Sequence, residues 1–229
     1  MENINGWLNI DKPLNYSSAK VVAIIKKMIK AKKVGHGGTL DPLATGVLPI
    51  CINKATKTTE KIMSFDKEYL FNITFGEERT TGDAEGDIVN TNNKIPTELE
   101  IKNIIPQFKG IIQQTPPIFS ALKINGKRAY ELARDNKEVK LQAREIRVDN
   151  LEFISFINKN TAQFKVKCGK GFYVRSIGID LSKALGTLGY ISYLRRLSVG
   201  IFNQTNIITL EELENKINYN QINKILIEI

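Results

Sequence analysis

Residues 35–46, Gly-His-Gly-Gly-Thr-Leu-Asp-Pro-Leu-Ala-Thr-Gly, form the most unusual stretch of this 229-residue chain. Its four glycines permit positive φ angles and let a ligand approach the backbone closely. Pro42 biases Asp41 away from helical geometry, so the Asp41 carboxylate is expected to project from an extended turn. Taken alone, the composition favours an ordinary glycine-rich connection in which Asp41 is a turn residue.

The loop is a poor phosphate-binding loop, because it lacks both GK[ST] and a GxGxxG pattern with a following acidic partner. A lone carboxylate in it could instead act as a nucleophile if a nearby arginine favours the anion. Arg175 is a candidate partner, within the segment GKGFYVRSI at 169–177, where a strand passes into a helix. Tyr173 and Arg175 share a face if the chain is still extended there. Spacing alone slightly favours a strand end with packed aromatics and a surface Arg175.

The composition is that of a folded globular protein. Hydrophobic residues make up 42% of the chain and charged residues 25%, which excludes wholesale disorder. The length allows one large domain or two small ones. A chain of this size buries roughly 70% of its unfolded surface, so it needs neither metal ions nor disulfides to form a core.

Several classes of protein are excluded. The longest purely apolar run, at 21–25, falls far short of the roughly 18 residues that a membrane span needs. The N-terminus lacks the pattern of a signal peptide. Cys51 and Cys168 lie far apart, and His36 is the single histidine, which argues against a zinc site, a disulfide framework and a Ser-His-Asp triad. We therefore expect a cytoplasmic protein that binds no metal and does not enter a membrane.

The net charge of +9 has two interpretations. Of the 33 cationic residues 25 are lysines, and asparagine and isoleucine are also abundant, so a coding bias could have produced a generally lysine-rich surface. The alternative is a nucleic-acid footprint, and charge alone does not decide between them. Five lysines do lie within eight residues, on an expected amphipathic helix just before the glycine-rich loop: Lys26, Lys27, Lys30, Lys32 and Lys33.

Hydrophobic periodicity predicts strands and helices without the regular alternation of a Rossmann or TIM fold, so the fold class is α+β. The residues at 77–87 read as a polar loop, and Asn125-Gly126 is a strong hairpin signal. The expected strands are 6–10, 47–52, 67–75, 144–156, 162–168 and a short one near 199, and the expected helices are 17–33, 56–64, 97–105, 130–135, 174–185 and a final stretch near the C-terminus.

Seven motifs occur in order along the chain, and together they carry a resemblance. They are Asp11-Lys12-Pro13, GHGGTLDPLATGVLP (35–49), Lys67-Glu68-Tyr69, Asp83-Ala84-Glu85-Gly86, Phe119-Ser120-Ala121-Leu122-Lys123, GKGFYVRSIGIDL (169–181) and Tyr193-Leu194-Arg195-Arg196-Leu197. From about residue 6 to 199 the set resembles the bacterial TruB family, the tRNA pseudouridine synthase B enzymes. The resemblance implies the pseudouridine synthase fold, a central mixed and mostly antiparallel sheet flanked by helices and loops, with an active-site cleft across the sheet.

The resemblance also implies an activity, the isomerisation of uridine 55 in the T loop of tRNA to pseudouridine. Uracil is detached from its ribose, turned, and rejoined through C5, and no cofactor is required. Asp41 matches the catalytic nucleophile and Arg175 the arginine that pairs with it. Tyr69 matches the tyrosine that stacks on the target base and takes part in proton transfer. Whether the carboxylate attacks the base or the sugar, or promotes a glycal route, stays open.

Further residues match substrate-binding positions of the family. Tyr173 and Leu194 match residues that line the uracil pocket, and His36 matches a histidine among the extruded bases. The target base must be flipped out of the folded tRNA at a cost of a few kcal/mol. Lys12, the lysine-rich helix end and Arg195-Arg196 are candidate contacts to phosphates.

The resemblance predicts a domain division and a set of partners. We expect a catalytic domain at 1–203 and, at 204–229, a short C-terminal remnant in place of a full RNA-binding PUA domain. That remnant predicts weaker tRNA affinity with the chemistry preserved. The expected partner is the T arm of tRNA, bound by a monomer without an obligatory protein partner.

Two alternative functions remain at this point. One is a guide-RNA-dependent pseudouridine synthase subunit, which the expected absence of a PUA domain disfavours. The other is a tRNA-binding folding helper whose catalysis is incidental. Asp41, Tyr69 and Arg175 occurring together favour the active enzyme.

Overall fold

The computed structural model describes residues 4–120, 122–124, 127–128 and 141–229, which fall into two compact units. Unit 1 comprises Met1–Glu68 and Arg195–Ile229, and unit 2 comprises Tyr69–Leu194. The divisions fall inside two strands, β4 (Lys67–Phe75) and β12 (Gly189–Val199).

The sheet of unit 1 is built around β3 (Ala44–Ile52), which is buried along almost its whole length. β1 (Gly6–Lys12) pairs with it antiparallel, from Gly6 opposite Ile52 to Lys12 opposite Gly46. The short β2 (Val34–His36) also pairs with β3. β12 follows β3 in the strand order, and β13 (Phe202–Asn203) pairs with β12.

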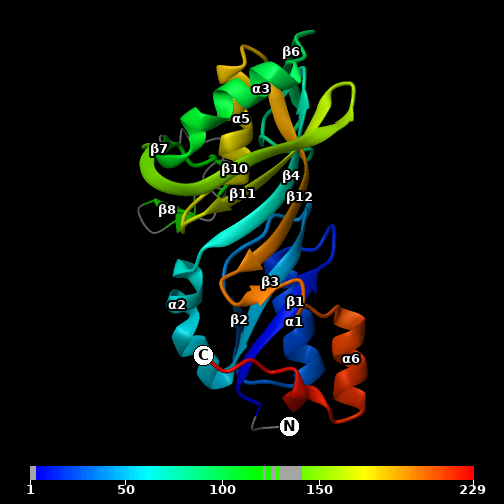
Figure 1. Cartoon of the computed structure of the whole chain (residues 1–229). Helices are drawn as coiled ribbons and strands as arrows, with labels where there is room; N and C mark the ends of the chain where they lie inside the picture. Colours follow the sequence, from blue (N-terminus) through cyan, green and yellow to red (C-terminus); the bar gives the residue numbers. More distant parts are fainter. Residues whose placement is uncertain (1–3, 121, 125–126, 129–140) are drawn as a thin grey trace. The chain divides into compact units, whose positions relative to one another are not determined.

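The main helix of unit 1 is α1 (Ser18–Ile29), which buries Val21, Ile25 and Ile29 at helical spacing. The Ser17 hydroxyl oxygen accepts the Lys20 N–H at 3.1 Å and caps its N-terminus. α1 and α6 lie side by side (Figure 1). The other elements here are η1 (Asn53–Thr58), α2 (Thr59–Ser64), α6 (Leu210–Asn218) and η3 (Ile222–Lys224).

The C-terminal segment is an integral part of unit 1. Trp7 and Ile227 exchange two backbone hydrogen bonds, at 2.9 and 2.8 Å. The Ile208 carbonyl accepts the Asp11 N–H at 2.8 Å. A buried cluster lies beneath, and each large apolar side chain in it contributes about 1.5–3 kcal/mol by leaving water. Its members are Trp7, Val47, Cys51, Ile62, Val199 and Phe202.

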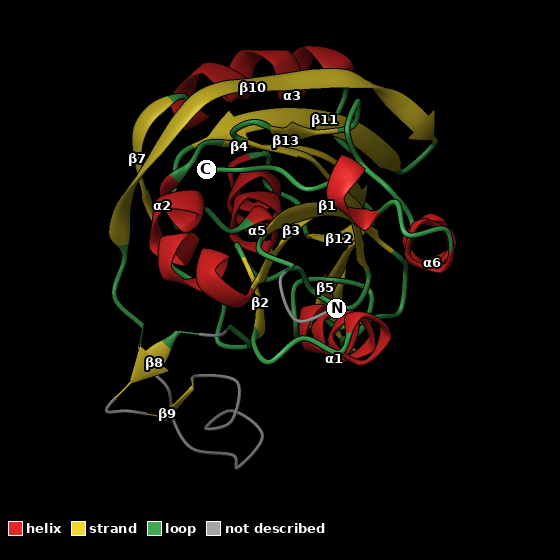
Figure 2. Ribbon diagram, turned by 90° about the horizontal axis from the view of Figure 1, so that it is seen from below, coloured by secondary structure: helices red, strands yellow, loops and turns green. Residues whose placement is uncertain are grey.

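The sheet of unit 2 continues from β12 through β4, β11 (Thr161–Cys168) and β10 (Arg144–Asn158) to β7 (Gly110–Gln114). Figure 2 shows β10 and β11 as a long curved antiparallel pair, with register shifts along its length. β4 buries every second side chain, and its Phe71 ring stacks on Phe164 with centroids 5.5 Å apart.

The remaining elements of unit 2 flank this sheet. The chief one for function is α5 (Val174–Ala184), which buries Ile177 and Leu181. α3 (Glu98–Ile104) begins at a capping box between Thr97 and Glu100. The others are β5 (Glu77–Arg79), β6 (Ile88–Thr91), η2 (Ile105–Phe108), β8 (Lys123–Ile124) and β9 (Lys127–Arg128).

The α+β class is confirmed, and the local predictions differ from the structure in several places. α1 ends at Ile29 and not near residue 33, because Lys30 adopts a left-handed φ of 51°. The expected polar loop at 77–87 begins with β5, which pairs with β6 as a small hairpin. The helix expected at 56–64 is 3-10 in its first part. β7 was not predicted, and the helix expected at 130–135 and the Asn125-Gly126 turn lie outside the described residues.

Gly46 generates the first prediction. Its φ is +98°, and a Cβ there would overlap the backbone oxygen of Arg196 and lie 3.0 Å from its nitrogen. Gly46→Ala should therefore cost several kcal/mol of unfolding free energy in urea denaturation, the left-handed strain plus a backbone clash. Gly110→Ala is the matched control, because Gly110 has a φ of +87° and nothing within 4 Å of a Cβ. It should lose only the strain, about 1–2 kcal/mol. Equal losses of unfolding free energy in the two variants would show that the Arg196 backbone does not exclude a Cβ at position 46.

Candidate active-site residues

The loop at 37–43, between β2 and β3, is held by its backbone. The Gly37 N–H donates to the Pro49 carbonyl at 2.8 Å, and the Ala44 N–H donates to the Asp41 carbonyl at 3.0 Å. The buried Ser18 hydroxyl accepts the Leu40 N–H at 2.8 Å and donates to the Leu40 carbonyl at 3.1 Å. The backbone on both sides of Asp41 is therefore fixed.

Two buried cations hold the carbonyl groups of the same loop. Arg196 is 1% exposed, and its guanidinium donates to Val47 O at 2.7 Å, Gly38 O at 3.1 Å and Thr39 O at 3.5 Å. Lys12 is 0% exposed, and its Nζ donates to Pro42 O at 3.1 Å. The Lys12 ammonium also donates to Pro13 O and Tyr16 O. A buried charge requires such hydrogen bonds, so these contacts tie the loop to β1, β3 and β12.

Two of the expected phosphate contacts, Lys12 and Arg196, are buried. Lys12 and Arg196 are enclosed by protein and bonded to carbonyl groups, which argues against either as a contact to RNA phosphates. Arg195 is partly exposed and forms a two-point ion pair with Asp11, at 2.8 and 3.0 Å. Sequence reasoning missed the burial, because lysines and arginines are usually found at the surface.

Asp41 and His36 are partly exposed members of the same neighbourhood. Asp41 lies between the anchored Leu40 and Pro42, in the non-helical conformation that the sequence predicts. His36 is the last residue of β2, opposite Ile50, and its Nδ1 accepts the Gly38 N–H at 3.4 Å. Unit 1 thus brings together three of the sequence-predicted residues, Lys12, His36 and Asp41.

Unit 2 holds the other predicted residues. Tyr69, on β4, is buried, and its ring stacks against Phe172 with centroids 6.5 Å apart and an interplanar angle of 30°. Phe172 directly precedes Tyr173, so the chain brings a third aromatic residue to this place. Leu194, on β12, is also buried.

Arg175 lies in the first turn of α5, whose start at Val174 agrees with the helix predicted at 174–185, so the face that Tyr173 and Arg175 would share on an extended chain does not form. The helix begins at Val174, so the extended chain on which that expectation rested ends at Tyr173. Arg175 is 5% exposed, which excludes the alternative of a surface arginine. Its guanidinium donates to Phe119 O at 2.8 Å and to Thr81 O at 3.2 Å.

Asp83 is a partner of Arg175 to which sequence reasoning gave no role. Its Oδ2 lies 3.6 Å from Arg175 Nε, and both side chains are buried. Its Oδ1 accepts the Glu85 N–H at 3.1 Å and the Thr81 hydroxyl. The motif Asp83-Ala84-Glu85-Gly86 was visible in the sequence, but nothing in its spacing pointed to a residue 92 positions away.

Gln114 is a second residue that the sequence did not reveal, because it ends the unpredicted strand β7. Its side-chain amide holds both backbone groups of Tyr173, accepting the N–H at 2.8 Å and donating to the carbonyl at 3.1 Å. The Ser176 hydroxyl donates to the Thr115 carbonyl at 2.6 Å. The end of β7 is thereby fastened to the start of α5.

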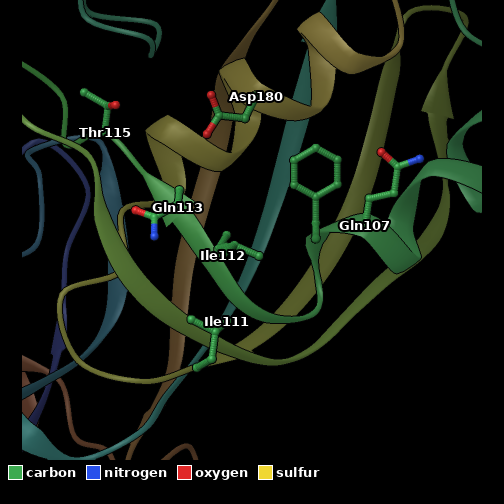
Figure 3. A pocket seen from close by; sticks show the side chains of 7 residues that line it. Gln107, Ile111, Ile112, Gln113, Thr115 and Asp180 are labelled. Atoms are coloured by element: carbon green, nitrogen blue, oxygen red, sulfur yellow. The ribbon is translucent and has the colours of Figure 1, made fainter.

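A cavity of about 400 Å³ lies within unit 2, beside β7, η2 and α5 (Figure 3). Phe108, Ile112 and Asp180 contribute to its lining, and none of the residues singled out from the sequence does. Burial raises the pKa of the Asp180 carboxyl, and the positive charge of Lys183 partly opposes this.

The described residues contain no group of three or more His, Cys, Asp or Glu side chains placed to hold a metal ion. Over the same residues, no helix has the length and apolar character needed to span a bilayer.

Two family models match the chain. The model described as TruB family pseudouridylate synthase (N terminal domain) matches residues 26–174. The model described as tRNA pseudouridylate synthase B C-terminal domain matches residues 175–226.

Curated relatives are similar over most of the chain. The tRNA pseudouridine synthase B of Ehrlichia ruminantium (strain Gardel) is 50% identical over 210 residues, which cover 91% of this chain and 71% of the relative. That of Anaplasma phagocytophilum (strain HZ) is 49% identical over 219 residues, covering 95% and 73%. That of Agrobacterium fabrum (strain C58 / ATCC 33970) is 47% identical over 210 residues, covering 92% and 67%.

Solved structures show the same fold. A chain of "Crystal Structure of a Cbf5-Nop10-Gar1 Complex" superposes with a TM-score of 0.77 at 29% identity, covering 97% of this chain and 60% of its own length. A chain of "Structure of H/ACA RNP bound to a substrate RNA containing 2'-deoxyuridine" has a TM-score of 0.72 at 27% identity, covering 96% and 55%. This chain thus spans less than two thirds of those two chains.

The Gln114 contacts generate the second prediction. Gln114→Ala removes both hydrogen bonds to the Tyr173 backbone and should lower the unfolding free energy by about 1–3 kcal/mol. Amide exchange at Tyr173 should become faster. Gln163→Ala is the control in the same unit, because Gln163 donates one hydrogen bond, to Asn72 Oδ1 at 3.1 Å. Unchanged exchange at Tyr173 in Gln114→Ala would show that the amide does not hold this backbone.

Proposed function

The chain belongs to the TruB family of pseudouridylate synthases, and from this premise we propose that it converts uridine 55 in the T loop of tRNA to pseudouridine. The family's enzymes are isomerases. The name tRNA pseudouridine synthase B, borne by relatives up to 50% identical, supports tRNA as the substrate. The observation that carries the proposal is the anchored loop of Asp41, whose backbone is held on both sides while the residue itself stays partly exposed.

Asp41 is the proposed nucleophile. A carboxylate on a fixed backbone meets its target in few geometries, which lowers the entropic cost of the reaction. The glycosidic bond between C1′ and N1 breaks, a bond between C1′ and C5 forms, C5 loses its proton and N1 takes one up, so atoms balance without a redox step. The proposal covers three routes, which differ in whether Asp41 attacks the base, attacks the sugar, or promotes a glycal.

Tyr69, Tyr173 and Leu194 are proposed to bind the flipped uracil. The stacking of Tyr69 on Phe172 supports this, because buried aromatic faces suit a base that has left its helix. Tyr69 is further proposed to take part in the proton transfer. His36 is proposed to stack among the extruded bases, in line with its partial exposure beside the loop.

Arg175 is proposed to pair with Asp41, as the family resemblance predicts. The support for this proposal comes from unit 2, where Asp83 and two backbone carbonyls hold the guanidinium in one orientation. A fixed cation stabilises developing negative charge without reorganising during the reaction.

The proposal includes a cellular setting and a choice of substrate. The enzyme acts in the cytoplasm as a monomer on the T arm, without a cofactor or an obligatory protein partner. An identity of 50% to relatives named tRNA pseudouridine synthase B, against 29% to a chain of the Cbf5 complex, favours tRNA as the substrate. The predicted division at residue 203 stays a prediction, as does weaker tRNA affinity.

Asp41→Asn generates the third prediction. An amide is not a nucleophile, so the variant should form no detectable pseudouridine at uridine 55 of unmodified tRNA, while still binding it. Chemical mapping of pseudouridine after incubation with the purified full chain gives the readout. Asp149→Asn is the control, because Asp149 is an exposed residue of β10 paired with Arg147 at 3.2 Å, a type of surface pair worth about 0–1 kcal/mol.

Three outcomes separate the parts of this proposal. If the wild type leaves uridine 55 unmodified, the proposed substrate is wrong. If Asp41→Asn remains active, the nucleophile is wrong. If both proteins bind and refold tRNA equally while neither modifies it, the folding-helper function replaces the enzyme.

A further inference from the structure

Asp180 carries a half-buried carboxylate that the protein itself does not pair. Among the residues that the structure describes, none forms a hydrogen bond or an ion pair with it. Lys183 follows three residues later on α5, but the two side chains form no ion pair. Burial therefore raises the pKa of the Asp180 carboxyl, and the positive charge of Lys183 opposes only part of this.

Folding alone does not account for this carboxylate. A pKa raised in the folded state means that the ionised form fits the folded protein less well than the unfolded one, so ionised Asp180 lowers stability at neutral pH. The loss disappears as the pH falls through the folded-state pKa, because the neutral form carries no such penalty. Asp180 lies in the motif GKGFYVRSIGIDL (169–181), of which the proposed function uses only Tyr173 and Arg175.

The Asp180 carboxylate lines the cavity of about 400 Å³ beside α5, η2 and β7 (Figure 3). Small-molecule sites have volumes of roughly 300–1,000 Å³. The cavity is reached from solvent, because Gln107 and Gln113 in its wall are exposed. A small molecule can therefore enter it and meet the carboxylate.

The walls of the cavity offer further polar groups and an apolar surface. Gln107, Gln113 and Thr115 line it, and their side chains form no hydrogen bond in the part of the chain that the structure describes. Phe108 and Ile112 supply the apolar surface. A few polar groups that converge beside apolar and aromatic side chains are the usual composition of a ligand site.

The charge of the lining selects the class of ligand. Asp180 is the charged member of the described lining, and the side chains from η2, β7 and Thr115 are uncharged. An anion would therefore meet a carboxylate with no compensating cation beside it. An organic cation would pair with Asp180 through charge-assisted hydrogen bonds and could rest against the face of Phe108.

We propose that this cavity binds a small organic cation, whose amidinium, guanidinium or ammonium group pairs with Asp180 and whose apolar body lies against Phe108 and Ile112. The inference goes beyond the proposed function, because no step at Asp41 uses this cavity. The chain has a net charge of +9, which disfavours general attraction of cations to its surface. Binding of a cation must therefore come from the local site.

The test uses a matched pair of probes, benzamidine and benzamide, with the full chain. Both are planar and nearly equal in size, but benzamidine is a cation and benzamide is neutral. Each is titrated at neutral pH into isotope-labelled protein while the amide chemical shifts are followed. Benzamidine should shift the amides at 107–115 and 180 and bind at least about tenfold more tightly than benzamide, because charge-assisted hydrogen bonds are roughly twice as strong as neutral ones.

Two variants with the same change of charge separate Asp180 from the rest of the protein. Asp180→Asn keeps the shape and should weaken benzamidine binding at least about tenfold. Asp149→Asn, at an exposed residue of the same unit, should keep the wild-type affinity. Lowering the pH through the raised pKa of Asp180 should weaken benzamidine binding to the wild type but not to Asp180→Asn.

Equal benzamidine affinity in the wild type and Asp180→Asn would overturn the proposal. So would equal affinity of the wild type for the two probes, or the absence of a saturable shift at 107–115. Asp180→Asn should also unfold in urea at a midpoint no lower than that of the wild type at neutral pH. A clear loss of stability in this variant would assign the carboxylate to the fold and remove the argument for a ligand.

Discussion

The hydrogen bonds from the buried Arg196 guanidinium to Val47, Gly38 and Thr39 are the contact on which the loop geometry depends. A glycine-rich loop has few side chains with which to fix itself, so its carbonyl groups need donors from elsewhere. Arg196 supplies them from β12, and Lys12 supplies another from β1 to Pro42. Burying a cation is costly unless it is fully hydrogen-bonded, so the loop and the cations each require the other.

This mutual dependence explains why the neighbourhood is so tightly packed. β3 approaches the Arg196 backbone so closely at Gly46 that no side chain fits there. The arrangement fixes the backbone on both sides of Asp41, the proposed nucleophile. Unit 2 also contains a buried cation held by several acceptors. Arg175, at the start of α5, is held by Asp83 and by two backbone carbonyls. In both units a buried cation, and not a regular hydrogen-bonding pattern, fixes the candidate catalytic segment.

Local sequence patterns predicted the elements whose structure depends on nearby residues. The alternation of Tyr69, Phe71, Ile73 and Phe75 placed β4 with its observed bounds, because one face of that strand is buried. Asp41 could be singled out from glycines and a proline within a few residues. Its proposed catalytic role came from the family motifs, and the comparisons confirm the family.

The features that the sequence did not predict depend on residues far apart in the chain. β7 has no alternation, since its Ile111 is exposed and only Gln114 is fully buried. The burial of Lys12 and Arg196 follows from carbonyl groups up to 158 positions away, which no local pattern encodes. Arg175 lies in a helix that the sequence predicts from residue 174, but its partners Asp83, Thr81 and Phe119 lie between 56 and 94 positions away, which no local pattern encodes.

Arg196→Met tests the central claim most directly, because it keeps the bulk and removes the donors. Hydrogen exchange of the amides at 38–44 measures the loop directly, and Arg79→Met is the comparison, because it should disturb its own hairpin and the contact with Tyr190, both in unit 2. The account predicts exchange at least about tenfold faster in this loop and a matching fall in pseudouridine formation, because unpaired buried carbonyls cost about 1–3 kcal/mol each. Wild-type exchange in the loop together with wild-type product formation would contradict it.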